Sequence, residues 1–367
     1  MPCLLNLRSY VRLSIVATFV LASACDQPAG PEPITQYDIL FVSSANGSQG
    51  QDIYRMSSDG TGRENLTKLS SVAFPTFELA VNYRSMALAP DGRMVAFETN
   101  RDGCPGVWGM NVDGTAIRKL SIGAFDATRC NYFALWSPDG SKIAFTTSRE
   151  GRYSVYVMNA DGSNPHNVSS QVDQDGFNWP SGWSPDGRVV FQHPVATTFQ
   201  TYIVKPDGTD LKLLFGRNGD HQPEWSRDGS KIAFIRDTEN GSGLFVMNAD
   251  GTNVRPLLSQ PGQVVSWQDG FQNDYNRWSS DGRRIVFVVR VNAENELHAI
   301  DVDGTNHVIL TSYPAEFNGW APDGRVTFSS NVSGSYDLYL INADGTGRVN
   351  LTSTSTSDEM RALWVKR

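Results

Sequence analysis

Hydrophobic and polar residues alternate in short runs along most of the chain. In KIAF (residues 142–145) and YVMN (residues 156–159), β-branched and aromatic residues alternate with smaller or polar ones, which is typical of half-buried strands. An Asp-Gly pair stands before the first run and after the second. Because glycine accepts positive φ without a steric penalty, each pair predicts a tight turn between two strands.

Two phrases built from these runs recur along the chain. The first is WSPDGSKIAF (residues 136–145), which returns as WSRDGSKIAF (residues 225–234), and the second is YVMNADGSN, which begins at Tyr156. The closing aromatic of the first phrase and of its relatives stands at Phe41, Phe97, Phe145, Phe191, Phe234, Phe287 and Phe328. The steps between them run from 41 to 56 residues. Periods of about 40–45 residues with strand-like phrases indicate propeller blades.

Each repeat predicts a four-stranded antiparallel sheet, with strands A to D in chain order and an Asp-Gly turn after A and after C. The chain enters at a strand B (DILFVSS, residues 38–44) and ends on a strand A (ALWVKR, residues 362–367). Pairing these two strands completes a seventh blade and removes exposed sheet edges. We therefore predict an all-β fold, a seven-bladed β-propeller over residues 38–367 whose N-terminal and C-terminal strands close the ring.

The first 24 residues read as a secretory signal peptide. Arg8 and Arg12 precede an apolar run that is too short to span a membrane, and small residues follow it. The stretch LASAC, which ends at Cys25, resembles the lipobox of bacterial lipoproteins, and this resemblance implies lipid attachment at Cys25. Residues 25–37 then form the lipidated cysteine and a polar, Pro-rich tether. We expect an exported protein, periplasmic or at the cell surface, that is anchored to a membrane through this lipid.

The joined phrases W-S-P-D-G-x-x-I-A-F and Y-V-M-N-A-D-G resemble the WD-type repeats of TolB-family β-propellers, and the resemblance covers residues 38–367. It implies a propeller fold and a role at the cell envelope. The chain departs from TolB in two respects: a short tether replaces TolB's preceding α/β domain, and seven repeats replace its six blades. Some peptidases join a similar propeller to an α/β-hydrolase domain, but the chain has no G-x-S-x-G nucleophile motif.

Composition narrows the range of partners. The formal net charge is −8, which argues against nucleic acid because a nucleic-acid partner requires a basic surface. We predict no cofactor, no catalytic residues and no metal. Of the five histidines, His193 and His221 are the two that could meet on one side of the ring.

Strand direction alternates, so both Asp-Gly turns of every repeat lie on one side of the ring, which we call the turn face. The opposite side, the loop face, carries the long irregular segments, at residues 70–86, 122–134, 171–182 and 260–277. Binding residues usually lie on such loops. Cys104 and Cys130 both fall on the loop face, and in an exported protein we predict a disulfide between them.

Strand A is expected to be innermost, so the residues before its closing Trp should border a central channel. Charged and aromatic residues at these places form the predicted binding site at the channel mouth: Arg84, Tyr132, Trp179, Asp220, His221, Glu224, Asp274, Arg277, Glu316, Glu359 and Arg361.

The sequence predicts a non-catalytic binding or scaffold protein of the cell envelope. An envelope protein or peptide is the expected partner, with a glycan as the second possibility. The alternative function is that of a polysaccharide lyase resembling the oligogalacturonate lyases, with a metal at the channel mouth. That alternative requires carboxylates to gather around His193 and His221.

Overall fold

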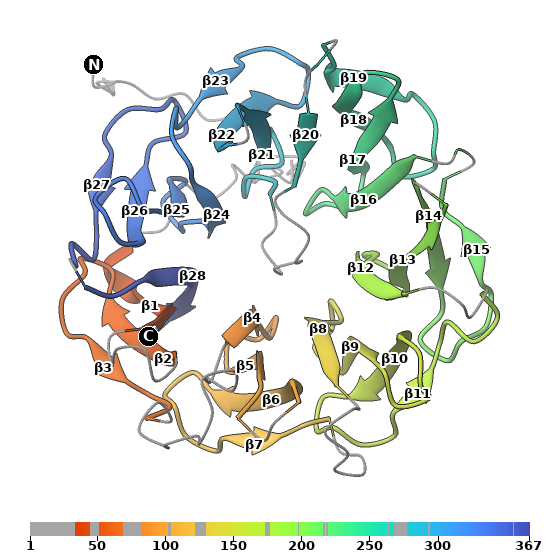
Figure 1. Cartoon of the computed structure of the whole chain (residues 1–367), viewed down its shortest axis with the longest axis horizontal. Helices are drawn as coiled ribbons and strands as arrows, with labels where there is room; N and C mark the ends of the chain where they lie inside the picture. The colour runs from red at the N-terminus through yellow and green to blue at the C-terminus, as the bar shows by residue number, and fades with distance from the viewer. Residues whose placement is uncertain are drawn as a thin grey trace, which may run out of the picture. The chain divides into compact units, whose positions relative to one another are not determined.

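The computed structural model describes residues 34–44, 51–68, 83–101, 104–121, 130–172, 177–196, 198–215, 217, 219–260, 262, 264–267, 277–292, 294–354 and 356–367. Within these ranges the strands form seven four-stranded antiparallel sheets, arranged as the blades of a ring (Figure 1). The predicted seven-bladed propeller is thus confirmed. A 3₁₀ turn, Ile34–Gln36, precedes the first strand. Among the described residues, no helix has the length and apolar character needed to cross a membrane.

The first four blades each contain four strands, named in order from the innermost to the outermost. Blade 1 consists of β28 (Glu359–Lys366), β1 (Tyr37–Ser43), β2 (Asp52–Ser57) and β3 (Glu64–Asn65). Blade 2 consists of β4 (Tyr83–Leu88), β5 (Met94–Thr99), β6 (Gly106–Asn111) and β7 (Arg118–Lys119). Blade 3 consists of β8 (Asn131–Trp136), β9 (Lys142–Thr147), β10 (Ser154–Asn159) and β11 (His166–Asn167). Blade 4 consists of β12 (Trp179–Trp183), β13 (Val189–Val195), β14 (Thr198–Val204) and β15 (Lys212–Leu213).

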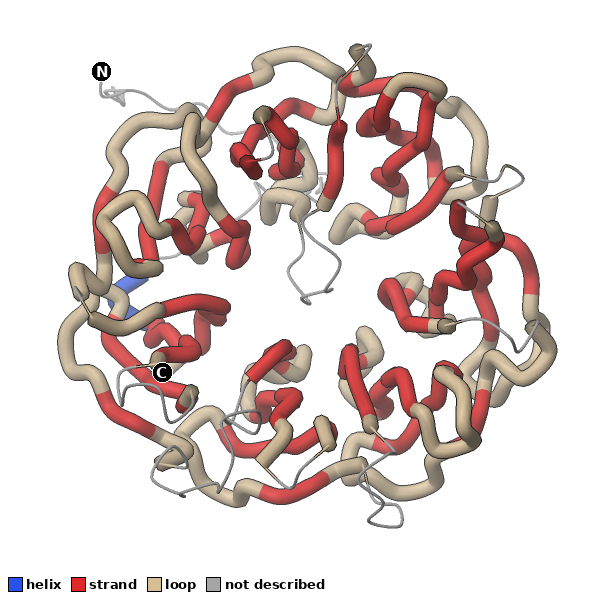
Figure 2. Tube along the Cα trace, viewed as in Figure 1, coloured by secondary structure: helices blue, strands red, loops and turns tan. Residues whose placement is uncertain are grey.

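The remaining three blades follow the same order. Blade 5 consists of β16 (Asp220–Trp225), β17 (Lys231–Thr238), β18 (Gly241–Asn248) and β19 (Arg255–Leu258). Blade 6 consists of β20 (Val264–Ser266), β21 (Arg284–Val291), β22 (Glu294–Asp301) and β23 (Val308–Ile309). Blade 7 consists of β24 (Glu316–Trp320), β25 (Val326–Ser330), β26 (Asp337–Ile341) and β27 (Val349–Asn350). Figure 2 shows the strands of every blade stepping outward from the ring's inner edge.

Blade 1 closes the ring with strands from both ends of the chain. The antiparallel ladder between β1 and β28 places Asp38 opposite Val365 and Ile39 opposite Trp364. Outside this ladder, the Arg367 Nε donates to Asp38 Oδ1 at 2.7 Å. The two incomplete repeats at the ends of the sequence therefore combine into one blade, as predicted.

The closing aromatic of each first phrase forms the core of its blade. Phe145 on β9 lies opposite Tyr156 on β10, and their ring centroids are 6.0 Å apart. The equivalent phenylalanines, from Phe41 to Phe328, are at most 1% exposed. Cross-strand aromatic pairs stabilise a sheet through packing, so the repeated phrase encodes the contact between the two middle strands of each blade.

The second Asp-Gly turn forms the same hydrogen bonds in each repeat. At Asp161 the carboxylate Oδ1 accepts the backbone N–H of Ser163 at 2.9 Å, and Gly162 has a φ of 90°. A Cβ on Gly162 would lie 2.4 Å from the carbonyl oxygen of Leu120, which belongs to the preceding blade, blade 2. Glycine is therefore required both by its backbone angle and by the contact with the neighbouring blade. The hydrogen bonds from Ser163 hold the pKa of Asp161 below its usual value.

The tryptophan that ends strand A bonds its blade to the one before it. The indole N–H donates to a backbone carbonyl of the preceding inner strand in four pairs: Trp136 to Ala87 (3.1 Å), Trp183 to Leu135 (3.1 Å), Trp278 to Glu224 (3.1 Å) and Trp320 to Arg277 (2.9 Å). A buried indole N–H needs an acceptor. The repeated Trp therefore serves the contact between blades.

Blade 6 corrects one sequence-based expectation. The sequence predicts a loop over residues 260–277, but Val264–Ser266 within that range forms the inner strand β20. Trp278 then meets β21 only through an isolated bridge to Ile285. Because β20 is only three residues long, its apolar run is not apparent from the repeat pattern. The other three predicted loop segments each end a few residues inside β4, β8 and β12.

Candidate functional site

The inner strands carry a bulge between the loop face and the closing Trp. The pairing register shifts between Tyr132 and Leu135 on β8 and between His221 and Glu224 on β16. Phe133 (φ 58°) and Gln222 (φ 53°) in these bulges have left-handed backbone, as does Arg361 (φ 60°) in the corresponding bulge of β28. Bulges redirect side chains, and non-glycine residues in this conformation concentrate at functional sites. The inner edge near the loop face is therefore the part of the ring where a site is expected.

Blades 3 to 5 bring a series of aromatic rings together at this edge, which we call the aromatic belt. Its members are Tyr132, Tyr153, Phe177, Trp179 and Phe199, all half-buried. Successive ring centroids are 6.1, 4.2, 5.5 and 5.3 Å apart, and the His221 ring lies 5.6 Å beyond Phe199. Tyr132, Trp179 and His221 occupy the same position in three successive inner strands, four residues before the closing Trp. The structure thus gathers three of the predicted site residues.

Charged groups at the end of the belt are paired with each other. Arg236 donates to both oxygens of Asp220 at 2.6 Å, and Asp220 is only 3% exposed. The His221 Nε2 lies 3.2 Å from Asp237 Oδ1. Bidentate pairs such as the one between Arg236 and Asp220 fix both geometry and charge. Asp220 and His221 were predicted from the sequence, whereas their partners Arg236 and Asp237 were not.

Glu224 and Arg277 form a buried contact between blades 5 and 6. The Arg277 backbone N–H donates to Glu224 Oε1 at 2.5 Å, while its guanidinium Nε lies 3.8 Å from Oε2. The guanidinium also packs between the rings of Trp267 and Phe317, with centroid distances of 5.3 and 5.1 Å. Burial raises the pKa of Glu224 to about 7, an effect that the charge on Arg277 only partly offsets. Burial likewise lowers the pKa of Arg277 to about 10. This pair therefore joins two blades.

Polar atoms without a hydrogen-bond partner are unevenly distributed around the ring. Among the described residues, such buried atoms occur in blades 2 to 6, on Ser85, Thr99, Trp108, Asn131, Ser181, Gln192, Thr198, His221, Gln222 and Arg277. Within the same described ranges, blades 7 and 1 contribute none. Buried polar groups are normally paired, so unpaired ones indicate an ordered water or a ligand.

The other predicted site residues lie apart from the belt. Glu359 in blade 1 is 1% exposed, and its carboxylate accepts hydrogen bonds from Ser43, Thr354 and Ser357. Glu316 begins β24 and Arg361 lies in the bulge of β28. Arg84 belongs to β4, but its side chain is not among the described ones, and Asp274 lies outside the described residues. The predicted residues therefore divide among several local structures.

Sequence reasoning misses three of the five residues of the belt. Tyr153 and Phe199 lie at the loop-face end of strand C, and Phe177 precedes strand A. None of them falls inside a repeated phrase. Their signal is an excess of aromatic residues next to the same loops that carry Tyr132 and Trp179.

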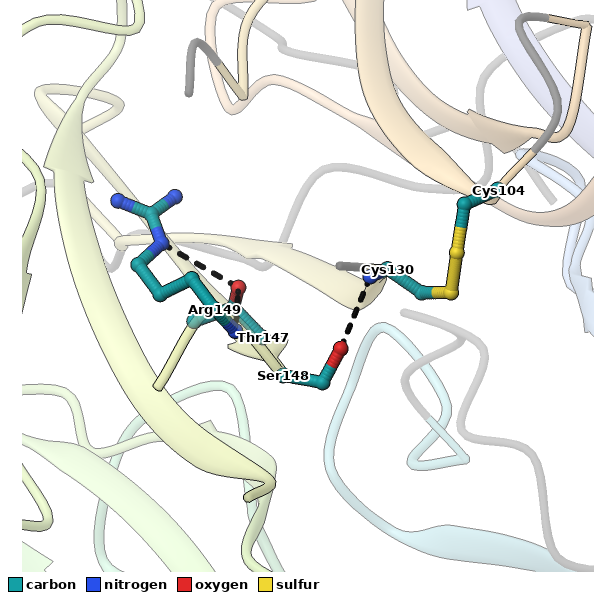
Figure 3. The surroundings of a disulfide bond; sticks show 5 residues. All are labelled: Cys104, Cys130, Thr147, Ser148 and Arg149. Atoms are coloured by element: carbon teal, nitrogen blue, oxygen red, sulfur yellow. Dashed lines mark hydrogen bonds between the residues drawn. A yellow bond between two sulfur atoms is a disulfide. The ribbon is translucent and has the colours of Figure 1, made fainter. Parts of the chain in front are cut away.

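Cys104 and Cys130 are joined by a disulfide, with their Cα atoms 5.1 Å apart (Figure 3). Cys104 lies between β5 and β6, and Cys130 directly precedes β8. The Ser148 Oγ accepts the backbone N–H of Cys130 at 2.9 Å (Figure 3). The bridge therefore ties blade 2 to blade 3 on the loop face, next to the start of the aromatic belt.

The histidines of the loop face have separate partners. The His193 Nδ1 lies 2.8 Å from Asn178 Oδ1, and His221 pairs with Asp237. In the part of the chain that the structure describes, no three His, Cys, Asp or Glu side chains gather in a way that could hold a metal ion. Cys25, the predicted lipid site, is outside the described residues.

Comparison with solved structures supports the architecture. The β-propeller domain of the Trilobed protease from Pyrococcus furiosus, which has an open velcro topology, aligns with a TM-score of 0.60 and 14% identity, over 89% of this chain and 96% of that one. An oligogalacturonate lyase in complex with manganese aligns with a TM-score of 0.53 and 16% identity, over 74% of this chain and 77% of the lyase. At this identity the likeness shows the fold alone. In contrast to the open topology, β1 and β28 pair in this chain.

Comparison of sequences, unlike the comparison of structures, identifies the family. A curated relative, the protein TolB homolog of Chlorobium luteolum, is 28% identical over 212 residues, which make up 58% of this chain and 34% of the homolog's own length. The chain thus spans about a third of that relative. The family model described as the TolB beta propeller domain matches residues 83–269 and 173–365. These matches cover most of blades 2 to 7 and reach β28. The chain belongs to the TolB β-propeller domain family.

Proposed function

We propose that the chain is a non-catalytic binding protein of the cell envelope, which presents its loop face to a protein or peptide partner. The observation that carries the proposal is the difference between the two faces of the ring. On the turn face, the second turn of every repeat keeps the same hydrogen bond. The Asp carboxylate accepts the backbone N–H of the Ser or Thr two residues later, as at Asp250 and Asp303. The loop face instead carries the aromatic belt and unlike charge pairs. Variation on a rigid scaffold supports a binding role.

The proposal is tested by cross-linking from each face in the source cells. A photoreactive residue is placed at Asn240 or Asn292, which are exposed on the loop face, or at Asp250 or Asp303, which are exposed on the turn face. We expect a discrete protein adduct from the loop-face positions only. Equal adducts from both faces, or no protein adduct from either loop-face position, would contradict the proposal.

We further propose that the protein is exported and anchored through a lipid on Cys25, because an apolar run and a lipobox-like stretch precede that residue. Metabolic labelling with a fatty acid should mark the wild-type chain and leave the Cys25→Ser variant unlabelled. Labelling of both, or of neither, would contradict lipid attachment at this residue. This outcome is independent of the binding proposal, because it does not involve the ring.

No observation of the site favours the lyase alternative. The two histidines that it requires are engaged with Asn178 and Asp237 in different blades. The likeness to the manganese-containing lyase extends to the fold, and we do not propose its activity for this chain.

A further inference from the structure

We infer that the aromatic belt and the adjoining polar side chains where blade 4 faces blade 5 bind an uncharged oligosaccharide. This ligand goes beyond the proposed function, which concerns a protein or peptide partner. The inference rests on three properties of one small region: half-exposed rings, unpaired neutral polar atoms and mutually paired charges.

The rings provide apolar faces of limited exposure. Trp179 and Phe199 meet edge to face, with centroids 5.3 Å apart and an interplanar angle of 79°. Phe199 meets His221 in the same manner, at 63°. A sugar ring has one face of C–H groups and an equator of hydroxyls. It can therefore rest its C–H face on a Trp or Phe ring while its hydroxyls reach polar atoms beside that ring.

The polar atoms beside these rings are unpaired and neutral. Trp179 on β12, Gln192 on β13 and Thr201 on β14 share one register position, so their side chains lie on the same side of blade 4. The Thr201 Oγ1 donates to the carbonyl of Asp220, which identifies that side as the one facing blade 5. The Gln192 Nε2 has no partner there although the residue is 1% exposed. The Thr198 Oγ1 of blade 4 and the His221 Nδ1 of blade 5 are also unpaired.

These atoms supply both donors and acceptors. An amide nitrogen donates, a threonine hydroxyl does either, and an imidazole nitrogen takes the role that its tautomer allows. A ligand rich in hydroxyls, which donate and accept equally well, satisfies such a mixed set directly or through an ordered water.

The charged groups beside these atoms are already paired, which favours an uncharged ligand. Arg236 is held by both oxygens of Asp220, and Asp237 is engaged by His221. A uronate or another acidic sugar needs a cation to replace its lost hydration, and Arg236 is already bound to a carboxylate. A neutral sugar does not incur this cost.

The experiment measures binding of neutral and acidic oligosaccharides to the purified full chain. The probes are neutral hexasaccharides of glucose, mannose, galactose and N-acetylglucosamine, with hexagalacturonate and a proline-rich peptide for comparison. Tryptophan fluorescence and titration calorimetry report binding. We expect at least one neutral hexasaccharide to bind, and Trp179→Ala to weaken it about tenfold or more, as truncation of a central aromatic contact does.

A second variant removes a polar contact without removing packing. Thr198→Val should weaken the same saccharide by several-fold while leaving the unfolding transition unchanged. Tyr313→Ala is the control, since Tyr313 is a half-buried ring in the loop between blades 6 and 7, and it should leave affinity unaltered.

The outcomes separate this inference from the proposed function. Absence of binding by all the neutral probes, stronger binding of hexagalacturonate, or binding of the peptide alone would overturn it. Equal loss in the Tyr313→Ala variant would also overturn it. Cross-linking of a protein partner from Asn240 or Asn292 in cells can succeed or fail independently, because it does not depend on the saccharide.

Discussion

The same repeat builds every blade, but its polar residues are arranged differently in two regions. One region is the junction of blades 7 and 1, and the other is blades 3 to 5. Where blades 7 and 1 meet, the fully buried Asp337 accepts five hydrogen bonds from four residues, Ser333, Asn350, Thr352 and Thr354. Glu359 beside it accepts three more. In blades 3 to 5, the inner edge near the loop face instead carries half-buried aromatic rings and unpaired polar atoms. The polar groups hold the ring closed on one side, and on the other side several of them have no partner.

The closing side also explains a sequence pattern that could be mistaken for glycosylation. Asn350-Leu-Thr and Asn65-Leu-Thr occupy the same place in blades 7 and 1. The Asn350 Nδ2 donates to Asp337 and its Oδ1 accepts the backbone N–H of Thr352, and Asn65 does the same with Asp52 and Thr67. These residues are therefore used within the outer strands of the two blades.

The largest expected effect comes from removing the closing strand. Deletion of residues 359–367 takes away β28, so blade 1 loses its inner strand and the ring opens. We expect loss of the cooperative thermal transition seen by far-ultraviolet circular dichroism. Deletion of Arg367 alone, which removes its bond to Asp38, is the control and should keep the transition. A cooperative transition in the longer deletion would show that closure is dispensable.

The next effect tests whether Arg277 serves the fold rather than a ligand. Arg277→Glu would place a second carboxylate beside Glu224, between two aromatic rings, and should lower the free energy of unfolding by about 3–5 kcal/mol. Arg348→Glu, on an exposed arginine, should change it by about 0.5 kcal/mol or less. Urea unfolding measures both. Similar small effects would return Arg277 to the candidate binding residues.

The two regions should also respond to pH in opposite directions. The pKa of Glu224 is raised from 4.5 to about 7, so the unfolded chain ionises first and the free energy of unfolding falls as pH rises across that interval. Burial opposes ionisation of Asp337, but its hydrogen bonds outweigh burial and hold its pKa below 3.8. Its stabilisation is therefore lost as the pH falls through and below that value.

Urea unfolding across this pH range separates the two contributions. Glu224→Gln should remove the decline that Glu224 causes as pH rises from its ordinary pKa to its raised one, and Asp337→Asn should reduce the acid-side loss. A Glu224→Gln variant that keeps the full decline would show that another group causes it.

The smallest expected effect is the change in stability caused by the same Thr-to-Val substitution in each region. Thr352→Val removes a hydroxyl that bonds Asp337 and Leu338, and should cost about 1–3 kcal/mol because buried partners lose a bond. Thr198→Val removes an unpaired hydroxyl and should be close to neutral. Equal costs in thermal unfolding would mean that the polar atoms of blade 4 are paired in solution.

The sequence is sufficient for the architecture because the architecture is local and repeated. Asp-Gly turns, the phenylalanine of strand B and the closing Trp each act within one blade or between neighbours, so the repeated copies of each signal reinforce one another. The prediction for blade 6 was wrong at its inner strand because β20 is only three residues long and does not run up to the closing Trp as β8, β12, β16 and β24 do.

The candidate site is predicted less completely because it depends on what the repeats do not share. Tyr132, Trp179 and His221 are found from their common position, but Tyr153, Phe177 and Phe199 approach them from other segments. Arg277 and Glu359 are charged residues of the kind that often bind ligands, but the structure buries both in contacts with other parts of the propeller. Which charges face outward depends on side-chain pairing between blades, and the pattern along one strand does not contain that information.

The tryptophan contacts between blades have a consequence for how such a ring can change over time. In four of the blades the indole recognises a main-chain carbonyl, and the residues that supply it are as different as Ala87, Leu135, Glu224 and Arg277. Since every residue has that carbonyl, the joint places no demand on the side chain across it. A lineage can therefore rewrite one blade's inner edge without disturbing its neighbour, so a new specificity can arise in a single module while the others keep the assembly intact.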